Sequence, residues 1–427
     1  MAVVLSGGIV LDPAAGSVAE REVVVAGDRI GGDAEIGERV DVSGCVVMPG
    51  NVCSHHHLYS VLARGMPGPP RSPRNFHEIL ELIWWRLDRA LDHNTIELSA
   101  RLGSVQAALA GTTSLIDHHA SPEAIDSSLD ALADGIAASG LRAVVCYEVT
   151  DRHGAERGRL GVEENARFLS ANRHPLIRGM VGGHASFTIG DGTLEALVAA
   201  ARDAGAPIHI HVAEDECDQR DALDEHGLRT VHRLVRAGAL AEGDLIAHGV
   251  HLDDSEIEAV RASGAWVAHN PRSNMNNGVG YAPVTRMGPR VGLGTDGIDG
   301  DMFAEARACY LKARENSLEI GPDFALERLA AGAAVVGASF GEPALGRIEP
   351  GAPADLVILE YRNPTPLSGD SLGGHFLFGL GAWDVRDVMV GGRWVVRARR
   401  HQLIDEEELA ARCREAAPRL WDRMNQF

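Results

Sequence analysis

The chain has 427 residues, of which 45% are apolar and 23% are charged, a composition typical of a globular protein with a large core. Its formal net charge is −20, and Lys312 is its only lysine. A surface this acidic argues against binding to nucleic acid or to an anionic membrane.

The cysteines and the first residues indicate where the protein works. The six cysteines are scattered and form no C-x-x-C pair, which suits a reducing compartment better than a disulfide framework. The opening MAVVLSGGIV lacks the basic start and apolar run of a signal peptide, and no stretch approaches ~18 apolar residues. We therefore expect a cytoplasmic protein.

The sequence pattern at both ends of the chain is typical of short β-strands. Brief β-branched runs separated by Gly and Asp fill residues 1–48, and similar runs return in GAPADLVILE and VRDVMVGGRWVV. This pattern predicts a small β-sandwich domain built from residues 1–49 and 346–427, the latter including a C-terminal helix. Residues 50–345 would form a second domain inserted between them.

The middle of the chain alternates between short apolar runs and segments of helical periodicity. The runs lie at 46–52, 113–117, 143–147, 179–183, 207–212, 244–248, 266–270 and 291–296. Eight βα repeats are the count of a closed (β/α)8 barrel, whose catalytic groups lie at the C-terminal ends of the strands. An open doubly wound sheet is the alternative, although no G-x-G-x-x-G follows the first run. The predicted class is α/β.

An insertion follows the first run. The stretch RGMPGPPRSPRNF is too long for a simple βα turn and is typical of a lid or a pocket wall. The next segment, HEILELIWWRLDRAL, is predicted to be an amphipathic helix. We expect its Trp84 and Trp85 to pack against the barrel, with stacking on a planar substrate as the alternative.

Histidines and acids recur at the predicted strand ends. In chain order these residues are His55, His57, His209, His211, Glu214, His248, His269 and Asp296. Alternate residues of a strand share a face, so His55 and His57 point the same way and can bind one metal ion. An isolated H-x-H is weak evidence. Because the strand ends of a barrel meet in one pocket, the whole set predicts a metal site.

At this point the sequence resembles a known family. PGNVCSHHH resembles the PGxxxxHxH signature of the amidohydrolase superfamily. The segments HVAE, AHG, HNPRSNM and GLGTDG resemble the later landmarks of its aminohydrolase and chlorohydrolase branch, in the same order. More narrowly, HHHLYSVLARGM and HNPRSNMNNGVGYAPV are similar to the SsnA aminohydrolases, and the 8-oxoguanine deaminases are related.

The resemblance implies a metal centre. Its ligands would be the imidazoles of His55, His57 and His211 and the carboxylate of Asp296. Binuclear members of the superfamily bridge two metals with a lysine, usually from strand four, whereas Lys312 lies beyond strand eight. We therefore expect one divalent ion. Zinc suits these ligands best, and iron(II) or manganese would also fit them.

The resemblance also implies catalytic groups. Asp296 would accept a proton from the metal-bound water, and Glu214 would act as acid and base. His248 would lie beside this water and orient or polarise it. His184 matches a position that contacts substrate.

The remaining candidates for substrate contact come from the residues themselves. Arg64 and Arg272 could hold a carboxylate or the oxygen edge of a ring, with structural ion pairs as the alternative. His118 would contact substrate or, alternatively, shape the floor of the pocket.

Together these features predict a hydrolytic deaminase. Metal-activated water would release ammonia from an amino-substituted N-heterocycle, purine- or pterin-like. The alternative is hydrolysis of a cyclic amide, a guanidine or a chloro-heterocycle at its C–N or C–Cl bond. A non-catalytic assembly role is disfavoured because no predicted ligand is lost. The partner would be a small molecule, and a homo-oligomer is compatible with the sequence but not determined by it.

Overall fold

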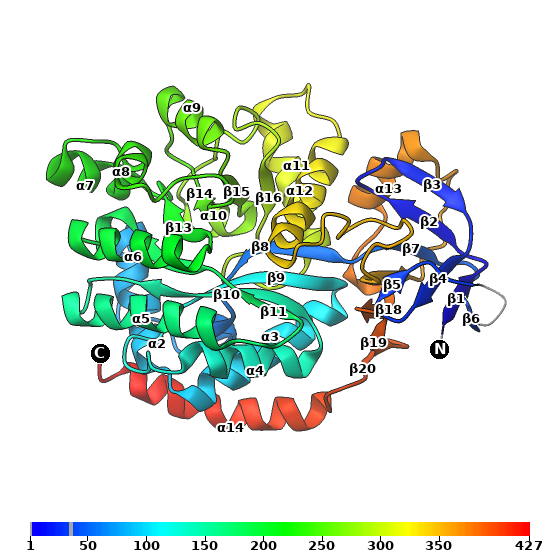
Figure 1. Cartoon of the computed structure of the whole chain (residues 1–427), viewed down its shortest axis with the longest axis horizontal. Coiled ribbons are helices and arrows are strands. Elements are labelled where there is room, and N and C mark those ends of the chain that lie inside the picture. The colour runs from blue at the N-terminus through cyan, green and yellow to red at the C-terminus, as the bar shows by residue number, and fades with distance from the viewer. Residues whose placement is uncertain (1, 34–36) are drawn as a thin grey trace.

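In the computed structural model, which describes residues 2–33 and 37–427, eight parallel strands form the central sheet in the order β8-β9-β10-β12-β13-β14-β15-β16 (Figure 1). They are β8 (Asn51–His56), β9 (Thr112–His119), β10 (Arg142–Val149), β12 (Val181–Ala185), β13 (Ile208–Val212), β14 (Leu245–His248), β15 (Trp266–His269) and β16 (Val291–Leu293). A short strand, β11 (Ile177–Gly179), adds to β10.

The sheet closes at its C-terminal end, where the candidate residues lie. Thr295 N and Asp296 N donate to His55 O at 2.9 and 3.0 Å, and His57 N donates to Asp296 O at 3.2 Å. The first and last strands are thereby joined. The predicted (β/α)8 barrel is confirmed, and the open sheet is wrong.

Helices surround the barrel (Figure 1). They are α3 (His93–Leu109), α4 (Ser128–Ser139), α5 (Ala155–Ala171), α6 (Asp191–Ala204), α7 (Glu216–His226), α8 (Thr230–Ala237), α9 (Asp254–Ser263), α10 (Pro271–Asn277), α11 (Met302–Asn316) and α12 (Asp323–Phe340). Local sequence sets their ends. Gly205 and Gly238 end α6 and α8 in the left-handed conformation, with φ of 60° and 75°. None of the helices in the described part of the chain has the length and hydropathy that a membrane crossing requires.

The two chain ends share one β-structure. A four-stranded sheet, β5-β4-β1-β6, consists of β1 (Val3–Ser6), β4 (Val23–Ala26), β5 (Arg29–Ile30) and β6 (Glu38–Asp41). A seven-stranded sheet, β20-β19-β18-β17-β7-β2-β3, consists of β2 (Ile9–Asp12), β3 (Ser17–Glu20), β7 (Val46–Pro49), β17 (Leu356–Leu359), β18 (Val385–Val390), β19 (Arg393–Arg397) and β20 (Arg400–His401). Since β7 lies between β2 and β17, both ends of the chain form this sheet.

The first predicted strand, 46–52, is in fact two strands. β7 belongs to the seven-stranded sheet and β8 to the barrel, and Gly50 lies between them. A Cβ on Gly50 would lie 2.1 Å from Thr113 Oγ1, so only glycine fits where the chain passes from one sheet to the other. Apolar content continues through this point, so the run gave no sign that the chain changes sheets.

Three helical segments follow β8 and its 3-10 turn (Leu58–Ala63). They are α1 (Phe76–Ile79), a π-helical turn (Leu80–Trp84) and α2 (Trp85–Ala90). The C-terminal helix α14 (Glu406–Met424) runs along the barrel beside α2 and α3 (Figure 1). Trp421 Nε1 donates to Leu62 O at 2.9 Å and Arg423 Nε donates to Ala90 O at 2.7 Å, which fixes α14 to the insertion.

Candidate active site

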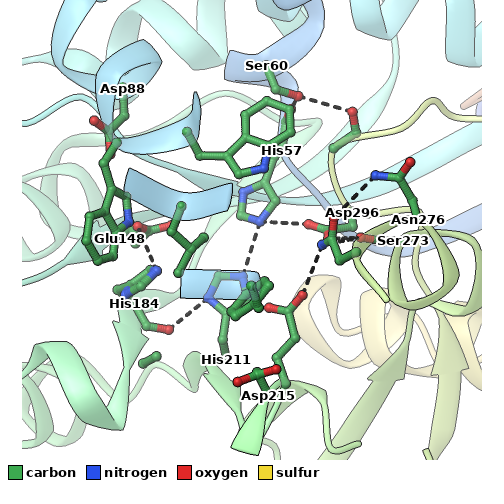
Figure 2. Close-up of a pocket in the computed structure, with 18 of the residues that line it drawn as sticks. His57, Ser60, Asp88, Glu148, His184, His211, Asp215, Ser273, Asn276 and Asp296 are labelled. Atoms are coloured by element: carbon green, nitrogen blue, oxygen red, sulfur yellow. Dashed lines mark hydrogen bonds and ion pairs between the residues drawn. The ribbon is translucent and has the colours of Figure 1, made fainter. Parts of the chain in front are cut away.

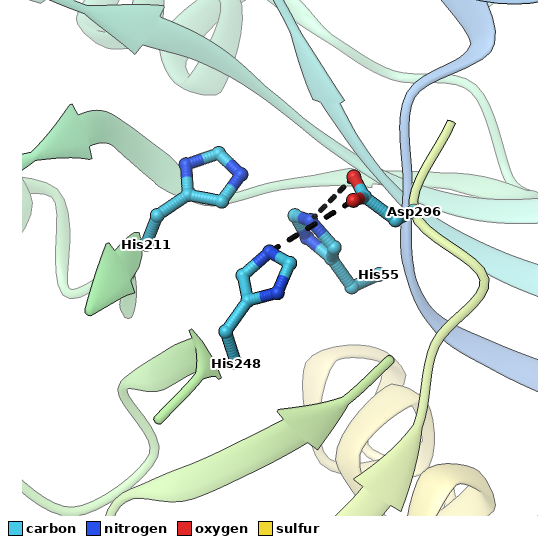
Figure 3. Close-up of side chains that lie close together, drawn as sticks. All are labelled: His55, His211, His248 and Asp296. Carbon is cyan, nitrogen blue, oxygen red and sulfur yellow. Dashed lines mark ion pairs between the residues drawn. The ribbon is translucent and has the colours of Figure 1, made fainter. Parts of the chain in front are cut away.

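The four predicted metal ligands converge at the C-terminal end of the barrel. His57 Nε2 lies 3.0 Å from Asp296 Oδ1 and 3.1 Å from His211 Nε2. His55 Nε2 lies 3.5 Å from the same Asp296 oxygen. Figure 3 shows His55, His211 and Asp296 grouped with His248, and one ligand atom of each lies within 4.8 Å of the others. Strands far apart in sequence therefore bring one donor set together.

The hydrogen bonds of His57 and His211 select the tautomer that a metal needs. His57 Nδ1 donates to His118 O at 2.6 Å, and His211 Nδ1 donates to His184 O at 2.8 Å. With the proton on Nδ1, each neutral ring turns the lone pair of Nε2 toward the cluster. Both rings can therefore offer Nε2 to a metal ion in this tautomer.

His55 supplies the clearest sign that an ion belongs here. Its Nδ1 bonds to His209 Nε2 at 2.9 Å, while its Nε2 is buried and has no hydrogen-bond partner among the described residues. Burial favours the neutral form of Asp296, but the adjacent imidazoles of His55 and His57 hold the pKa of its carboxyl well below the usual value. Three imidazole nitrogens and one ionised carboxylate form a donor set that fits a divalent metal.

Three non-glycine residues at this end adopt the left-handed conformation. They are Ala213 with φ of 48°, His248 with 73° and Asp296 with 53°. Such conformations cost on the order of 1–3 kcal/mol and occur preferentially at functional sites. Ala213 follows β13 directly and turns the chain so that Glu214 faces the cluster.

Glu214 and His248 lie together beside the ligand carboxylate. Glu214 Oε2 is 3.5 Å from His248 Nε2, which is itself 4.0 Å from Asp296 Oδ2. Burial and the nearby charge of Asp296 raise the pKa of Glu214 to about 7. A carboxyl with this pKa can both give and take a proton at neutral pH.

Helix α10 orients all three acid–base groups. It begins at Pro271, directly after the N-cap residue that follows β15, and three of its polar side chains reach the site. Ser273 Oγ donates to Asp296 Oδ2, Asn274 Oδ1 contacts His248 Nδ1 at 2.9 Å, and Asn277 Nδ2 donates to Glu214 Oε1 at 3.2 Å. Sequence reasoning missed Ser273, although it lies within the HNPRSNM segment.

A cavity of about 260 Å³ opens beside the cluster (Figure 2). Its aromatic wall consists of Tyr59, Phe76, Trp84, Trp85 and Phe187. Trp84 and Trp85 were expected to pack against the barrel, and the structure places them on the cavity as well. The π-helical turn that ends at Trp84 puts both indoles on this side.

The predicted histidines divide between the cavity wall and its floor. His184 lines the cavity, with Nδ1 2.6 Å from Thr188 Oγ1, and burial lowers its pKa to about 3. His118 is fully buried and does not line the cavity. Its Nδ1 donates to Glu148 Oε2 at 3.2 Å, so it supports the floor, as the alternative interpretation held.

The structure does not bring the two predicted arginines to the cavity. Arg64 is exposed and donates to Gln106 Oε1 at 3.2 Å. Arg272 bonds to Glu305 and, at 2.8 Å, to Asp299 Oδ1. Glu305 is fully buried and holds the guanidinium, and Arg272 is not among the residues that line the cavity. The expectation that either arginine anchors substrate is corrected accordingly.

Sequence reasoning also missed an ionic network on the opposite wall. Arg152 Nη2 lies 3.2 Å from both Asp88 Oδ2 and Glu148 Oε1, and its guanidinium stacks 4.6 Å from the ring of Trp85. Asp88 and Glu148 line the cavity. Glu148 lies near the C-terminal end of β10, so a search for acidic residues at the ends of the predicted strands could have found it. Asp88, in α2, gave no such signal.

Comparison with known proteins agrees with this geometry. A family model described as the amidohydrolase family matches residues 46–395. A 5-methylthioadenosine/S-adenosylhomocysteine deaminase of Halobacterium salinarum is 33% identical, over 97% of this chain and 95% of that protein. A 5′-deoxyadenosine deaminase of Methanosarcina mazei is 30% identical, over 98% of this chain and 97% of that protein.

Solved structures share the fold. An adenosine deaminase from Xanthomonas campestris with bound zinc has a TM-score of 0.85 and 23% identity, and the match covers 100% of this chain and 99% of that one. An atrazine chlorohydrolase from Arthrobacter aurescens in complex with zinc has a TM-score of 0.84 and 21% identity, covering 97% and 100%. At these identities the likeness shows the fold alone.

Proposed function

Because this chain belongs to the amidohydrolase family, we propose that it is a metal-dependent hydrolase that releases ammonia from an amino-substituted, purine-like N-heterocycle. Relatives named as deaminases of adenosine derivatives favour a purine-like ring over a pterin. The narrower resemblance to the SsnA aminohydrolases stays a prediction.

The proposed metal ligands are His55, His57, His211 and Asp296. These residues would hold a divalent ion, in our proposal zinc, which would lower the pKa of water from ~15.7 to ~7 and so supply hydroxide at neutral pH. His118 O and His184 O hold the rings of His57 and His211 in the ligand tautomer. This arrangement supports the ligand assignment without fixing the identity of the ion.

The protons are moved by the chain's own residues. Asp296 accepts a proton from the attacking water, and the Ser273 hydroxyl holds its carboxylate in place. Glu214 delivers a proton to the ring nitrogen, the proton taken up by Asp296 passes to the amino group, and the tetrahedral carbon then expels that group as ammonia. His248, held in place by Asn274, polarises the same attacking water.

One observation carries this proposal: Glu214 and His248, which are not proposed ligands, lie 3.5 Å apart beside Asp296. An amino group leaves only after it has been protonated, whereas chloride leaves as an anion and needs no proton. Two proton carriers next to the ligand carboxylate therefore favour deamination over the alternative hydrolysis of a C–Cl bond.

The test is product analysis on purified, zinc-loaded protein. A panel of amino-purines, amino-pterins, amino-pyrimidines, cyclic guanidines and chloro-triazines is assayed for ammonia and chloride, with the Asp296→Asn variant as the blank. We expect ammonia from a purine class and almost none from the variant. Chloride without ammonia would overturn the proposed reaction. Variant turnover above a few per cent would overturn the role of Asp296.

We also propose the domain boundaries predicted from the sequence, with the barrel at 50–345. Two facts support them: β7 ends at Pro49, and every proposed ligand and proton carrier lies between His55 and Asp296. Helix α14 belongs to the C-terminal segment by sequence but packs against the barrel.

A further inference from the structure

Apart from the proposed metal ion, the charged groups around the cavity are acidic side chains. Among the described residues that line it, none is an arginine or a lysine. Apart from Glu214 and Asp296, its acidic side chains are Asp88, Glu148, Asp215 and Asp218. Figure 2 shows Asp88 and Glu148 on the side opposite Asp296. A substrate carboxylate or phosphate would therefore find no cationic side chain on the cavity wall.

The nearest guanidinium is already compensated. Arg152 does not line the cavity, and its Nη2 is 3.2 Å from a carboxylate oxygen of Asp88 and 3.2 Å from one of Glu148. Two carboxylates facing one guanidinium leave no net positive charge for a ligand. Arg152 therefore fixes the acidic wall rather than opposing it.

The same wall holds polar atoms that lack partners. Asp88 is 1% exposed, and its Oδ1 is buried without a hydrogen-bond partner among the described residues. The indole Nε1 of Trp85 is likewise buried and unpaired. Both residues line the cavity. An acceptor and a donor in this state match a neutral polar group that offers an N–H or O–H to Asp88.

The size of the cavity further limits which ligands can fit. At about 260 Å³ the cavity lies just below the usual range of ~300–1,000 Å³ for ligand pockets. Aromatic side chains face it, including Trp84 and Phe187, and offer flat apolar surfaces to a ring. A fused ring with a small substituent suits this space better than a ring with a long charged chain.

We infer that Asp88, together with Glu148 and Asp215, restricts this site to compact neutral or cationic heterocycles and rejects those that carry a carboxylate or a phosphate. The inference rests on the proposed function for the ring chemistry. Its physical basis is the repulsion between a ligand anion and the acidic wall. Because burial raises the pKa of Asp88 to about 7, Asp88 contributes its full charge to this repulsion only above neutral pH. At an effective dielectric constant of ~20, a like charge about 7 Å away weakens binding roughly 50-fold.

The test uses pairs of ligands that differ in charge and hardly in shape. Adenosine-5′-carboxamide and adenosine-5′-carboxylate form one pair, and pterin-6-carboxamide and pterin-6-carboxylate form the other. Calorimetry on zinc-loaded protein measures the affinity of each member. In the pair whose ring is accepted, we expect the carboxylate to bind roughly 50-fold more weakly than the amide. Equal or tighter binding of the carboxylate would overturn the inference, as would failure of both amides to bind.

Variants then locate the effect. Asp88→Asn removes the charge and keeps the shape, and we expect the ratio between amide and carboxylate to fall at least about fivefold. Glu81→Gln, on an exposed carboxylate of the π-helical turn that precedes α2, is the matched control and leaves the ratio unchanged. If Asp88→Asn does not fold, Asp215→Asn serves, since Asn can still cap α7. An unchanged ratio in a folded Asp88 or Asp215 variant would overturn the role of that residue.

Ammonia release measured in the same samples separates this inference from the proposed function. Discrimination between the paired ligands without ammonia from any amino-heterocycle would refute deamination and support the charge preference. Ammonia with equal affinity for both members of a pair would refute the charge preference alone.

Discussion

Replacing Glu214 by glutamine removes one proton carrier and little else. Glutamine keeps the volume of the side chain, and its carbonyl oxygen can still accept from Asn277 Nδ2, now at 3.2 Å from Glu214 Oε1. The amide cannot hold or release a proton near neutral pH. His248 loses the carboxylate 3.5 Å from its Nε2 but keeps its contact with Asn274. The metal ligands are untouched.

The size of the effect follows from this geometry. A positioned acid–base group contributes ~10²–10⁴-fold to the rate, equivalent to ~2.7–5.4 kcal/mol of barrier. We therefore expect kcat of the Glu214→Gln variant to fall by about that factor while KM changes little. Metal content stays at the wild-type value because Glu214 is not a proposed ligand.

The assay is steady-state ammonia release on protein whose zinc content has been measured. Glu216→Gln is the control, because Glu216 lies two residues further on with an 80% exposed side chain. We expect it to keep wild-type activity. A Glu214→Gln variant that retains more than about a tenth of kcat, or one that loses its metal, would refute the assigned role.

Two further predictions concern the metal and the second arginine. We expect exhaustive chelation to abolish activity and to lower the melting temperature, and added zinc to restore both. An ion whose free concentration is 1,000 times its Kd adds ~4 kcal/mol of stability. Turnover by metal-free protein would contradict this prediction. Arg272→Ala leaves the buried Glu305 unpaired, so we expect a loss of ~3–5 kcal/mol in urea unfolding with KM unchanged, whereas Arg64→Ala changes neither. A raised KM with unaltered stability would restore Arg272 as a substrate anchor.

The (β/α)8 barrel could be predicted from the sequence because its signals are local. Apolar runs and helical periodicity recur within short windows, and glycines such as Gly205 mark the helix ends. The place of the candidate metal site could also be predicted. Alternation along a strand puts His55 and His57 on one face, and the closure of eight strands directs their ends to one place.

The sequence did not reveal pairings between distant residues. Arg152 meets Asp88 across 64 positions of the chain, and Arg272 meets Glu305 across 33. No periodicity specifies which of several arginines finds which carboxylate. The sequence therefore left open whether Arg64 and Arg272 hold substrate or form ion pairs, and only the packed structure shows both of them outside the cavity.

The amino-acid sequence by itself thus determined the number of barrel strands and the order of the elements, because each depends on neighbours along the chain, whereas the candidate ligands were named from the family resemblance. The tertiary structure decided how Ser273, Asn274 and Asn277 orient the acid–base groups. It also decided that the cavity wall is acidic. These features depend on the directions in which side chains point after β15, α10 and the insertion have packed together, and packing is a property of the whole chain.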